Sequence, residues 1–505
     1  MKASIDLFDL VKSLSGPEKG YFKKHSAIKS SANKNYLQLF DAIEKQEVYD
    51  EAALRTEFKN HPFARQFPVA KTYLYERILT ALDSYHSSDQ ETIRTHLHDA
   101  EVLHEKGLYG QALKAVKKAK EAALLCDLHY FLPEVFHWEL NLAKEQYDLD
   151  WTGKAMDEQA GYLGLLQNTL AYRRVSLTIG LLAEKARKIN TKEISAQIKK
   201  LIAQPALRSE SLALTFTAKL YFHNSHFNLA VAGKEYSKGR VHLEKIVSLC
   251  EANPRKTKNN FHFYMVILNN LLEHYFENRN YENALTRLDK FRHTLSVVKD
   301  YSSSAYQFYV YQSYFLRYMK NTGQFSKAAA LLPRIVKEQK QYRNELSQVE
   351  KIILHSFYAL IWFGAEQYKK CIHLLNILRN ELSLEQRPDI DSFLRVFYII
   401  AHYEAGHGDL LPHLVRSAQR GLQKQQHPGR FEKIMLDFFQ REFLNAPPKK
   451  KMTEAFIGLK NELLPLTRDP DEQNVFEFFD YISWLEGKIE SKSFAEVVRL
   501  KVKKG

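Results

Sequence analysis

Histidines and carboxylates at helical spacing are the first residues in this sequence whose types could bind a metal ion. His98, Glu101 and Glu105 are three and four residues apart, which places them on one face of a helix, with His104 close by. Carboxylates at this distance from a histidine are, however, typical of the solvated face of an amphipathic helix, and the zinc pattern His-Glu-x-x-His is absent. We predict no metal site, and leave open only whether this one face binds a metal.

His223 and His226 form a second pair, which is interpreted as part of a hydrogen-bonded loop. The candidate nucleophiles are three isolated cysteines, Cys126, Cys250 and Cys371. An odd number without Cys-x-x-Cys spacing excludes a disulfide framework and a zinc knuckle, and it favours a reducing compartment. Because Cys250 follows an apolar stripe and Cys371 occupies a small-residue position, we expect both to be packed core thiols.

Paired carboxylates offer no clearer catalytic signal. Asp389 and Asp391, and likewise Asp469 and Asp471, lie beside a proline, where helix starts attract acidic residues. The sequence has no Gly-x-Gly-x-x-Gly after a strand, no Gly-x4-Gly-Lys-Ser/Thr loop and no Gly-x-Ser-x-Gly elbow. We therefore predict no catalytic residue, no cofactor and a protein that is not an enzyme.

Positive charge is the remaining candidate for binding chemistry. The chain has 73 Lys and Arg against 59 Asp and Glu, a formal net charge of +14. Residues 183–260 contribute 15 basic and 6 acidic side chains, whereas residues 96–182 contribute 9 and 12. The candidate residues for binding an anionic partner are Lys185, Arg187, Lys188, Lys192, Lys199, Lys200, Lys234, Lys238, Arg240, Arg255, Lys256 and Lys258.

Such a cluster has two interpretations. It could hold phosphates or an acidic peptide, which would make the chain an RNA- or ribosome-associated protein that binds through residues 183–260. It could also be a solvated basic surface that only aids solubility. No Lys/Arg-Gly-Phe-x-Phe run, Gly-x-x-Gly clamp or pentatricopeptide code accompanies the charge. The charge by itself therefore identifies no ligand.

Helices must position all of these residues. The chain has 505 residues, is 45% hydrophobic, and contains only 19 Gly and 14 Pro. Apolar residues recur with helical spacing along almost the whole chain, as in the stripes that run from Leu74 to Tyr85 and from Tyr264 to Tyr275. The sequence predicts an all-α protein.

A turn motif recurs between these predicted helices: a small or polar residue, a spacer, an aromatic residue, two spacers and a small residue. Copies begin at positions 107, 279, 323 and 366, and a degenerate fifth spans 406–411. The first residue allows a left-handed backbone, the aromatic residue fills the gap between helices, and the small residue lets the second helix approach. The predicted structural residues are Gly107, Tyr109, Ala112, Tyr281, Ala284, Gly323, Phe325, Ala328, Tyr368 and Cys371.

This motif resembles the tetratricopeptide repeat, whose Gly/Ala, Tyr and Ala positions match Gly107, Tyr109 and Ala112, with Ala119 at the next small position. Tyr281 and Phe325 are 44 residues apart and Phe325 and Tyr368 are 43 apart, against about 34 in that family, so a HEAT-like geometry stays open. The segment 13–24 and the closing stretch 479–499 also resemble helical-repeat proteins of Bacteroidetes-type bacteria, a resemblance that brings no activity with it. The resemblance implies a right-handed α-solenoid of tetratricopeptide-like hairpins.

Three regions are expected: a helical cap over 1–88, the solenoid over 89–445, and a second helical cap over 446–505. Helices at 36–47, 49–60 and 69–86 raise the alternative of a DNA-binding helix-turn-helix. That motif needs a turn of about 3 to 4 residues, and the link from 60 to 69 is longer, so this alternative is disfavoured.

The N-terminus carries Asp6 and Asp9 where a secretory signal needs an apolar run, and apolar runs elsewhere are too short to span a bilayer. We therefore expect a cytoplasmic protein without membrane insertion. The predicted function is a non-catalytic scaffold or adaptor that binds a segment of a partner protein in the solenoid groove. Its oligomeric state stays open.

Overall fold

The computed structural model describes most of the chain, namely residues 5–14, 16–27, 33–85, 88–145, 149–188, 192–233, 235–297, 304–342, 345–380, 388–423, 429–444, 449–469 and 471–504. It divides into two compact units. The first unit holds residues 1–278 and 293–302, and the second holds residues 279–292 and 303–505. Each unit is described by itself.

The described residues form 26 α-helices and short 3-10 segments, without a strand, so the predicted all-α class is confirmed. The first unit contains α1 (Asp6–Ser13), α2 (Gly16–Ala27), α3 (Asn33–Lys45), α4 (Glu51–Glu57), α5 (Phe67–Tyr85), α6 (Asp89–Glu105), α7 (Tyr109–Leu125), α8 (Leu132–Glu145), α9 (Leu149–Lys188), α10 (Lys192–Ile202), α11 (Phe216–Ala232), α12 (Tyr236–Ala252), α13 (Pro254–Lys258) and α14 (Phe261–Glu277).

Most of α15 (Tyr281–Val297) belongs to the second unit. The other helices of that unit are α16 (Ser304–Asn321), α17 (Phe325–Gln339), α18 (Gln348–Gly364), α19 (Tyr368–Asn380), α20 (Pro388–Glu404), α21 (Leu411–Gln423), α22 (Arg430–Leu444), α23 (Lys449–Leu463), α24 (Val475–Phe478), α25 (Tyr481–Glu490) and α26 (Phe494–Lys504). Among the described residues, no helix combines the length and the apolar character that a membrane span requires.

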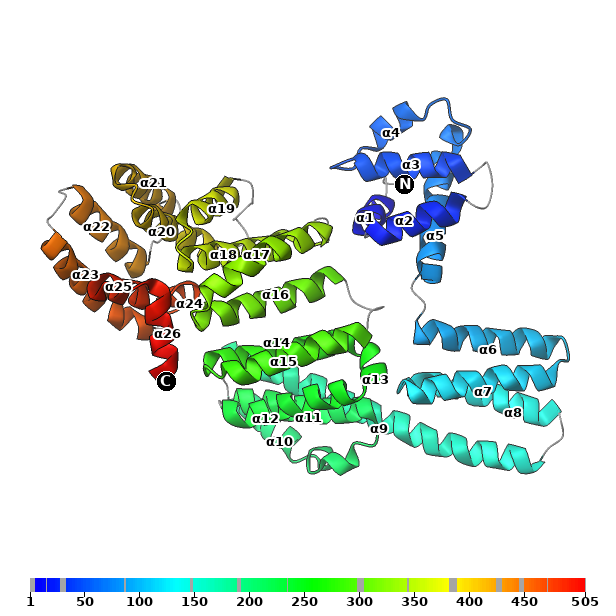
Figure 1. Ribbon diagram of the computed structural model, residues 1–505. Helices are drawn as coiled ribbons and strands as arrows, with labels where there is room; N and C mark the ends of the chain where they lie inside the picture. The colour runs from blue at the N-terminus through cyan, green and yellow to red at the C-terminus, as the bar shows by residue number, and fades with distance from the viewer. Residues whose placement is uncertain are drawn as a thin grey trace. The chain divides into compact units, whose positions relative to one another are not determined.

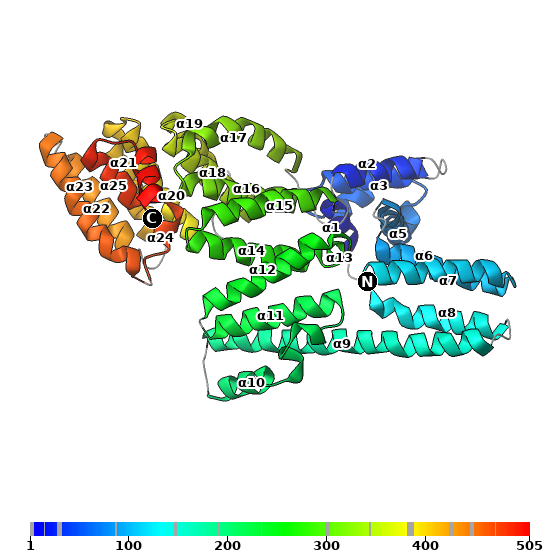
Figure 2. The ribbon, with the colours of Figure 1, turned by 60° about the horizontal axis from the view of Figure 1, so that its bottom comes forward.

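Helices α1 to α5 pack around an apolar core of their own, which includes Phe40, Phe67 and Leu74. The next helices of the first unit pair with their chain neighbours: α6 with α7, α8 with α9, and α11 with α12 (Figures 1 and 2). In the second unit one core cluster extends from residue 352 to residue 485. The last 60 residues therefore share a core with the helices before them, and the three predicted regions stay a prediction.

Each copy of the predicted turn motif lies between two helices. The first position has a positive φ in every copy, at Gly107 (+70°), Arg279 (54°), Gly323 (+68°), Glu366 (59°) and Gly406 (+78°). At Gly107, Gly323, Glu366 and Gly406 the next residue donates its backbone N–H to a carbonyl five residues back, as in Leu108 to Leu103 (2.9 Å). This Schellman arrangement satisfies carbonyls that the end of a helix leaves unpaired.

Two further turns of this kind escaped the sequence search. Asp127 has a φ of 61°, and the N–H of Leu128 bonds the carbonyl of Ala123 (2.8 Å). Between α11 and α12, the N–H of Glu235 bonds the carbonyl of Ala230 (2.8 Å), and the aromatic and small positions are Tyr236 and Gly239.

The aromatic residue of the motif fills space between helices. In the second unit, a Cβ added to Gly364, near the end of α18, would lie 2.2 Å from the Phe325 ring. The same ring lies 5.3 Å from the ring of Phe494 in α26. The aromatic residue of one turn thus packs against the next hairpin and against the C-terminal helix, and only glycine fits opposite it.

Candidate partner-binding groove

Seven of the twelve predicted basic side chains lie in the described part of the chain, and several of these seven contact other residues. Lys185 and Lys200 are exposed, on α9 and α10. Lys238 forms an ion pair with Glu235 (2.8 Å), and Arg240 forms one with Glu244 (2.9 Å). The side chains of Arg187, Lys188, Lys192 and Lys199 lie outside the described part of the chain. The same holds for the whole of Lys234.

The basic residues at α13 contact other parts of the first unit. The Arg255 side chain interacts with the thiol of Cys126, the residue that follows α7. The ammonium group of Lys256 lies 5.9 Å from the centre of the Phe216 ring at the start of α11. Lys258 is half-buried and also has an intramolecular partner. Lys256 and Lys258 are thus half-buried against the unit, whereas Arg255 is exposed.

A cavity of about 310 Å³ opens on the first unit, between α9, α11, α12 and α14. Its apolar wall is formed by Phe227 and Val231 from α11 with Tyr236 and Leu243 from α12. Polar groups come from Asn228 and Asn270, and the small residues Gly180 and Ala183 of α9 complete the lining. Eight of the 13 lining residues belong to the segment 183–260 that the charge pattern singled out.

The charges of this cavity are mainly acidic. Its lining contains three carboxylates, Glu184, Glu273 and Glu277, and one guanidinium, Arg240. Burial, with the charge of Arg240 next in weight, lowers the pKa of His274, so its imidazole stays neutral at pH 7. Arg240 is moreover paired with a glutamate. The described lining therefore combines an apolar wall with mainly acidic charged groups, and its three carboxylates, like Arg240, each have a partner within the chain.

Glu244 connects two of the helices that form the cavity. It accepts a hydrogen bond from Arg240 (2.9 Å) in its own helix and from the Tyr275 hydroxyl of α14 (2.8 Å). One carboxylate thus fixes the Arg240 side chain and links α12 to α14. The sequence gives no sign of this link, because Glu244 and Tyr275 are 31 residues apart.

A cluster of histidines lies between α11 and α12. Nδ1 of His223 is 3.0 Å from Nδ1 of His242, and the ring of His226 stacks on that of His242 at 4.8 Å. Nε2 of His226 lies 3.1 Å from the carbonyl oxygen of Leu207, and Nε2 of His223 lies 3.3 Å from Glu210. The predicted loop at 223–226 is wrong, because both residues lie within α11.

No metal site accompanies these histidines. Within the ranges that the structure describes, no group of three or more His, Cys, Asp or Glu side chains is placed to hold a metal ion. His98 lies 3.3 Å from Glu101 on an exposed face of α6, whereas the ring of His104 packs against those of Tyr109 and Trp138. This is the arrangement expected of a solvated helix face with one buried flank.

The candidate nucleophiles are buried. Cys126, Cys250 and Cys371 are free thiols in the apolar core. Burial raises the pKa of Cys250 to about 12 and raises the pKa of Cys371 as well, so neither thiol forms the reactive thiolate at neutral pH.

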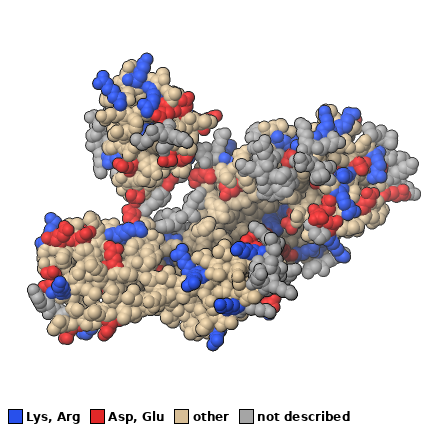
Figure 3. Space-filling model, turned by 180° about the vertical axis from the view of Figure 1, so that it is seen from behind, with Lys and Arg blue, Asp and Glu red and all other residues tan. Residues whose placement is uncertain are grey.

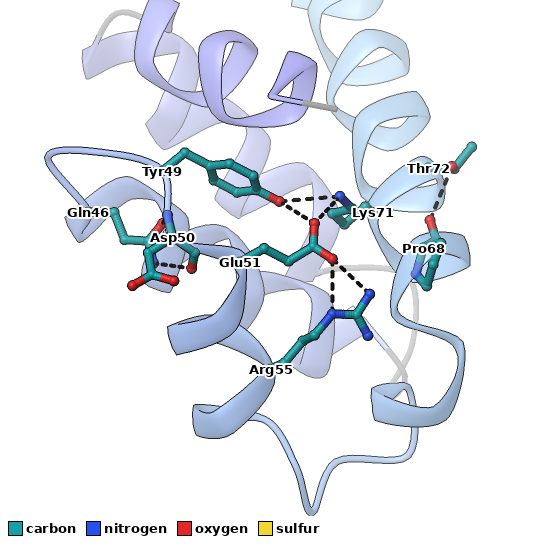
Figure 4. A network of polar contacts seen from close by, with 8 residues as sticks. All are labelled: Gln46, Tyr49, Asp50, Glu51, Arg55, Pro68, Lys71 and Thr72. Atoms are coloured by element: carbon teal, nitrogen blue, oxygen red, sulfur yellow. Dashed lines mark hydrogen bonds and ion pairs between the residues drawn. The ribbon is translucent and has the colours of Figure 1, made fainter. Parts of the chain in front are cut away.

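A carboxylate with a strongly shifted pKa lies in the N-terminal helices (Figure 4). Glu51 contacts Lys71 (2.7 Å) and Arg55 (2.7 Å) and accepts a hydrogen bond from the hydroxyl of Tyr49 (3.0 Å). Burial opposes its ionisation, but the bonds from Lys71 and Arg55 outweigh burial and lower the pKa of Glu51 to about 2. The network fastens α4 to α5, and such a carboxylate is a poor proton acceptor.

Comparison with protein-family models, with curated proteins and with solved structures finds no match to this chain. The resemblance to tetratricopeptide repeats therefore rests on the turn motif and on the packing of helices next to their chain neighbours.

Proposed function

We propose that this chain is a non-catalytic scaffold or adaptor, and that it binds a segment of a partner protein in the groove between α9, α11, α12 and α14. The observation that carries the proposal is the cavity of about 310 Å³, which combines an aromatic and aliphatic wall with three carboxylates. The partner segment presents an apolar side chain to the wall and a lysine or arginine to the carboxylates.

The arrangement of the helices belongs to the same proposal. A right-handed, tetratricopeptide-like solenoid with helical caps is supported by the recurring left-handed turns and by the pairing of helices that are adjacent in the chain. A cytoplasmic location is supported by the three reduced cysteines.

Nucleic-acid binding through residues 183–260 is the alternative. Lys185 and Lys200 are exposed and would favour it. Lys238 and Arg240, in contrast, are engaged by Glu235 and Glu244, and an ion-paired cation attracts phosphate more weakly. The alternative is therefore secondary.

A displayed library of random peptides, selected on the purified full chain, tests the proposal. We expect the selected peptides to share a lysine or arginine near an apolar residue. The double variant Glu184→Gln with Glu273→Gln is expected to bind them at least tenfold more weakly, because each lost charge-assisted hydrogen bond costs roughly 1.5 to 3 kcal/mol. Fluorescence anisotropy with a labelled peptide gives the dissociation constants.

The control is Glu121→Gln, which removes an exposed carboxylate from α7 of the same unit and should leave binding unchanged. A library that yields no peptide, or peptides whose binding ignores the double variant, contradicts the proposal. Selective binding of a 20-nucleotide RNA under the same conditions supports the alternative.

A further inference from the structure

The long helix α9 has an apolar stripe on its exposed side. Met156, Leu163, Leu170 and Leu177 recur every seven residues, and their exposed fractions are 57%, 38%, 52% and 57%. Leu181 continues the stripe with 68% exposed. Side chains on the opposite side of the same helix, including Tyr172, Val175 and Ile179, are buried in the first unit.

This pattern differs from that of an ordinary surface helix, which is polar on its outer side. A second series lies on the same side of the helix, each member four residues after a member of the first. It consists of Ala160, Gln167, Arg174 and Leu181. Spacings of four and three residues in turn are the heptad pattern of a coiled-coil seam. From residue 156 to residue 181 the seam is roughly 37 Å long at a rise of about 1.5 Å per residue.

Neighbouring groups leave the seam open to another helix. Gly161 and Gly164 lie beside it, and a Cβ added at either would meet nothing within 4 Å. The amide of Asn168 bonds the backbone of Leu212 (2.9 Å) and Leu214 (3.0 Å), which holds these two exposed leucines against one flank of α9. In Figure 3 the region at lower left, which holds α6 to α9, shows a broad uncharged area between scattered charged side chains.

We propose that two copies of this chain associate through this face of α9, with the two helices antiparallel about a two-fold axis. The charges of Arg174 on the stripe and of Asp157 beside it favour that orientation. Asp157 is exposed at the N-terminal end, and Arg173 and Arg174 are exposed towards the C-terminal end. A parallel pair would place Arg174 against its own copy, whereas an antiparallel pair places it beside Asp157 of the second copy.

The packing layers agree with this orientation. When Met156 of one helix faces Arg174 of the other, Ala160 faces Leu170 and Leu163 faces Gln167, so each of these layers pairs a large apolar side chain of one series with a member of the other series. Glu158 takes no part, because it forms an ion pair with Lys120 (2.7 Å) within its own chain. The same surface patch serves both copies, as a two-fold interface requires.

Sedimentation equilibrium of the full chain at 1 to 100 µM tests the proposal. We expect a dimer, with twice the 59.0 kDa mass of one chain. The variant Leu163→Glu with Leu170→Glu is expected to raise the dimer dissociation constant at least tenfold. The matched control, Leu125→Glu, places the same charge on an exposed leucine at the end of α7 and should leave the dimer intact. Circular dichroism of each variant shows whether it is folded.

Charge exchange tests the orientation. Asp157→Arg alone and Arg174→Asp alone are each expected to weaken the dimer, and the double exchange is expected to restore it. A wild-type chain that is monomeric at 100 µM overturns the proposal, and so does a dimer that survives both glutamates at 163 and 170. A double exchange without any restoration overturns the antiparallel orientation.

Discussion

The histidines between α11 and α12 make the stability of the first unit sensitive to acid. Burial, with His226 and His223 adding to it, lowers the pKa of His242 to about 4, and burial also lowers the pKa of His223 and of His226. A histidine whose pKa is lower in the folded state than in the unfolded state binds fewer protons when folded. The free energy of unfolding should therefore be constant above about pH 6.5 and should fall as the pH falls towards 4.

The variant His242→Asn tests this effect, because asparagine offers a polar atom near the position of Nδ1 but does not titrate. Between pH 7.5 and pH 5, we expect the variant to lose less unfolding free energy than the wild type, by on the order of 1 kcal/mol, a figure reduced for the half-exposure of the ring. Urea unfolding at the two pH values measures the difference. His98→Asn, on an exposed face of α6, is the control, and an equal loss in His242→Asn and in the wild type would contradict the assignment.

For single residues, the sequence predicted whether a side chain is buried better than it predicted which side chains it contacts. The apolar stripe at Cys250 and the small-residue position of Cys371 in the turn motif predicted packed thiols, and both are buried. The spacing of His223 and His226 predicted a loop, but both belong to a helix and their stacking partner, His242, lies on the next helix. A contact between two helices leaves no mark in the spacing along either one.

The interhelix turns allow a test at the scale of the element, because two glycines share a backbone conformation but differ in surroundings. Gly107 and Gly323 both have a φ near +70°. A Cβ added at Gly107 would meet nothing within 4 Å. A Cβ added at Gly323 would lie 2.8 Å from the Arg499 side chain and 3.0 Å from the Ala495 carbonyl oxygen. We expect Gly107→Ala to cost about 1 to 2 kcal/mol, which is the left-handed strain alone. Gly323→Ala should cost roughly 1 to 3 kcal/mol more, because it also overpacks the contact with α26.

Urea unfolding, monitored by circular dichroism, gives both values. The reverse substitution is the control: Glu366 has a φ of 59°, so Glu366→Gly relieves the strain and should stabilise the chain by a few tenths to about 1 kcal/mol. Equal losses at 107 and 323 would show that the contact with α26 is not formed in solution.

At the scale of the whole molecule, the net charge of +14 predicts attraction to any nucleic acid at low salt. Because Lys238 and Arg240 are ion-paired and Arg255 and Lys256 contact other side chains, we expect this attraction to be unspecific. The affinity for a 20-nucleotide polyuridine should fall at least tenfold between 50 and 200 mM salt, as anisotropy would measure. Binding that persists at 200 mM and falls in Lys185→Glu with Lys200→Glu would instead favour the nucleic-acid alternative.

The sequence by itself determined the all-helical class and the positions of the interhelix turns. Both depend on local physics: apolar residues repeat with the period of a helix, and a residue that accepts a left-handed backbone follows where a helix ends. The copy at Tyr236 and Gly239 was missed although its sequence, from Lys234 to Gly239, fits the same pattern of a polar residue, a spacer, an aromatic residue, two spacers and a small residue. An aromatic residue followed three positions later by glycine was the signal that would have revealed it.

Only the tertiary structure decided which charged side chains meet one another. Counting charges along residues 183–260 indicated a basic surface, but Glu235 and Glu244 engage two of its cations, and three carboxylates are among the described residues that line the cavity in this region. These carboxylates come from helices about 90 residues apart, Glu184 in α9 and Glu273 in α14. The periodicity of one helix fixes which face it buries, but the groups that meet across a groove depend on how several helices pack, which no local pattern encodes.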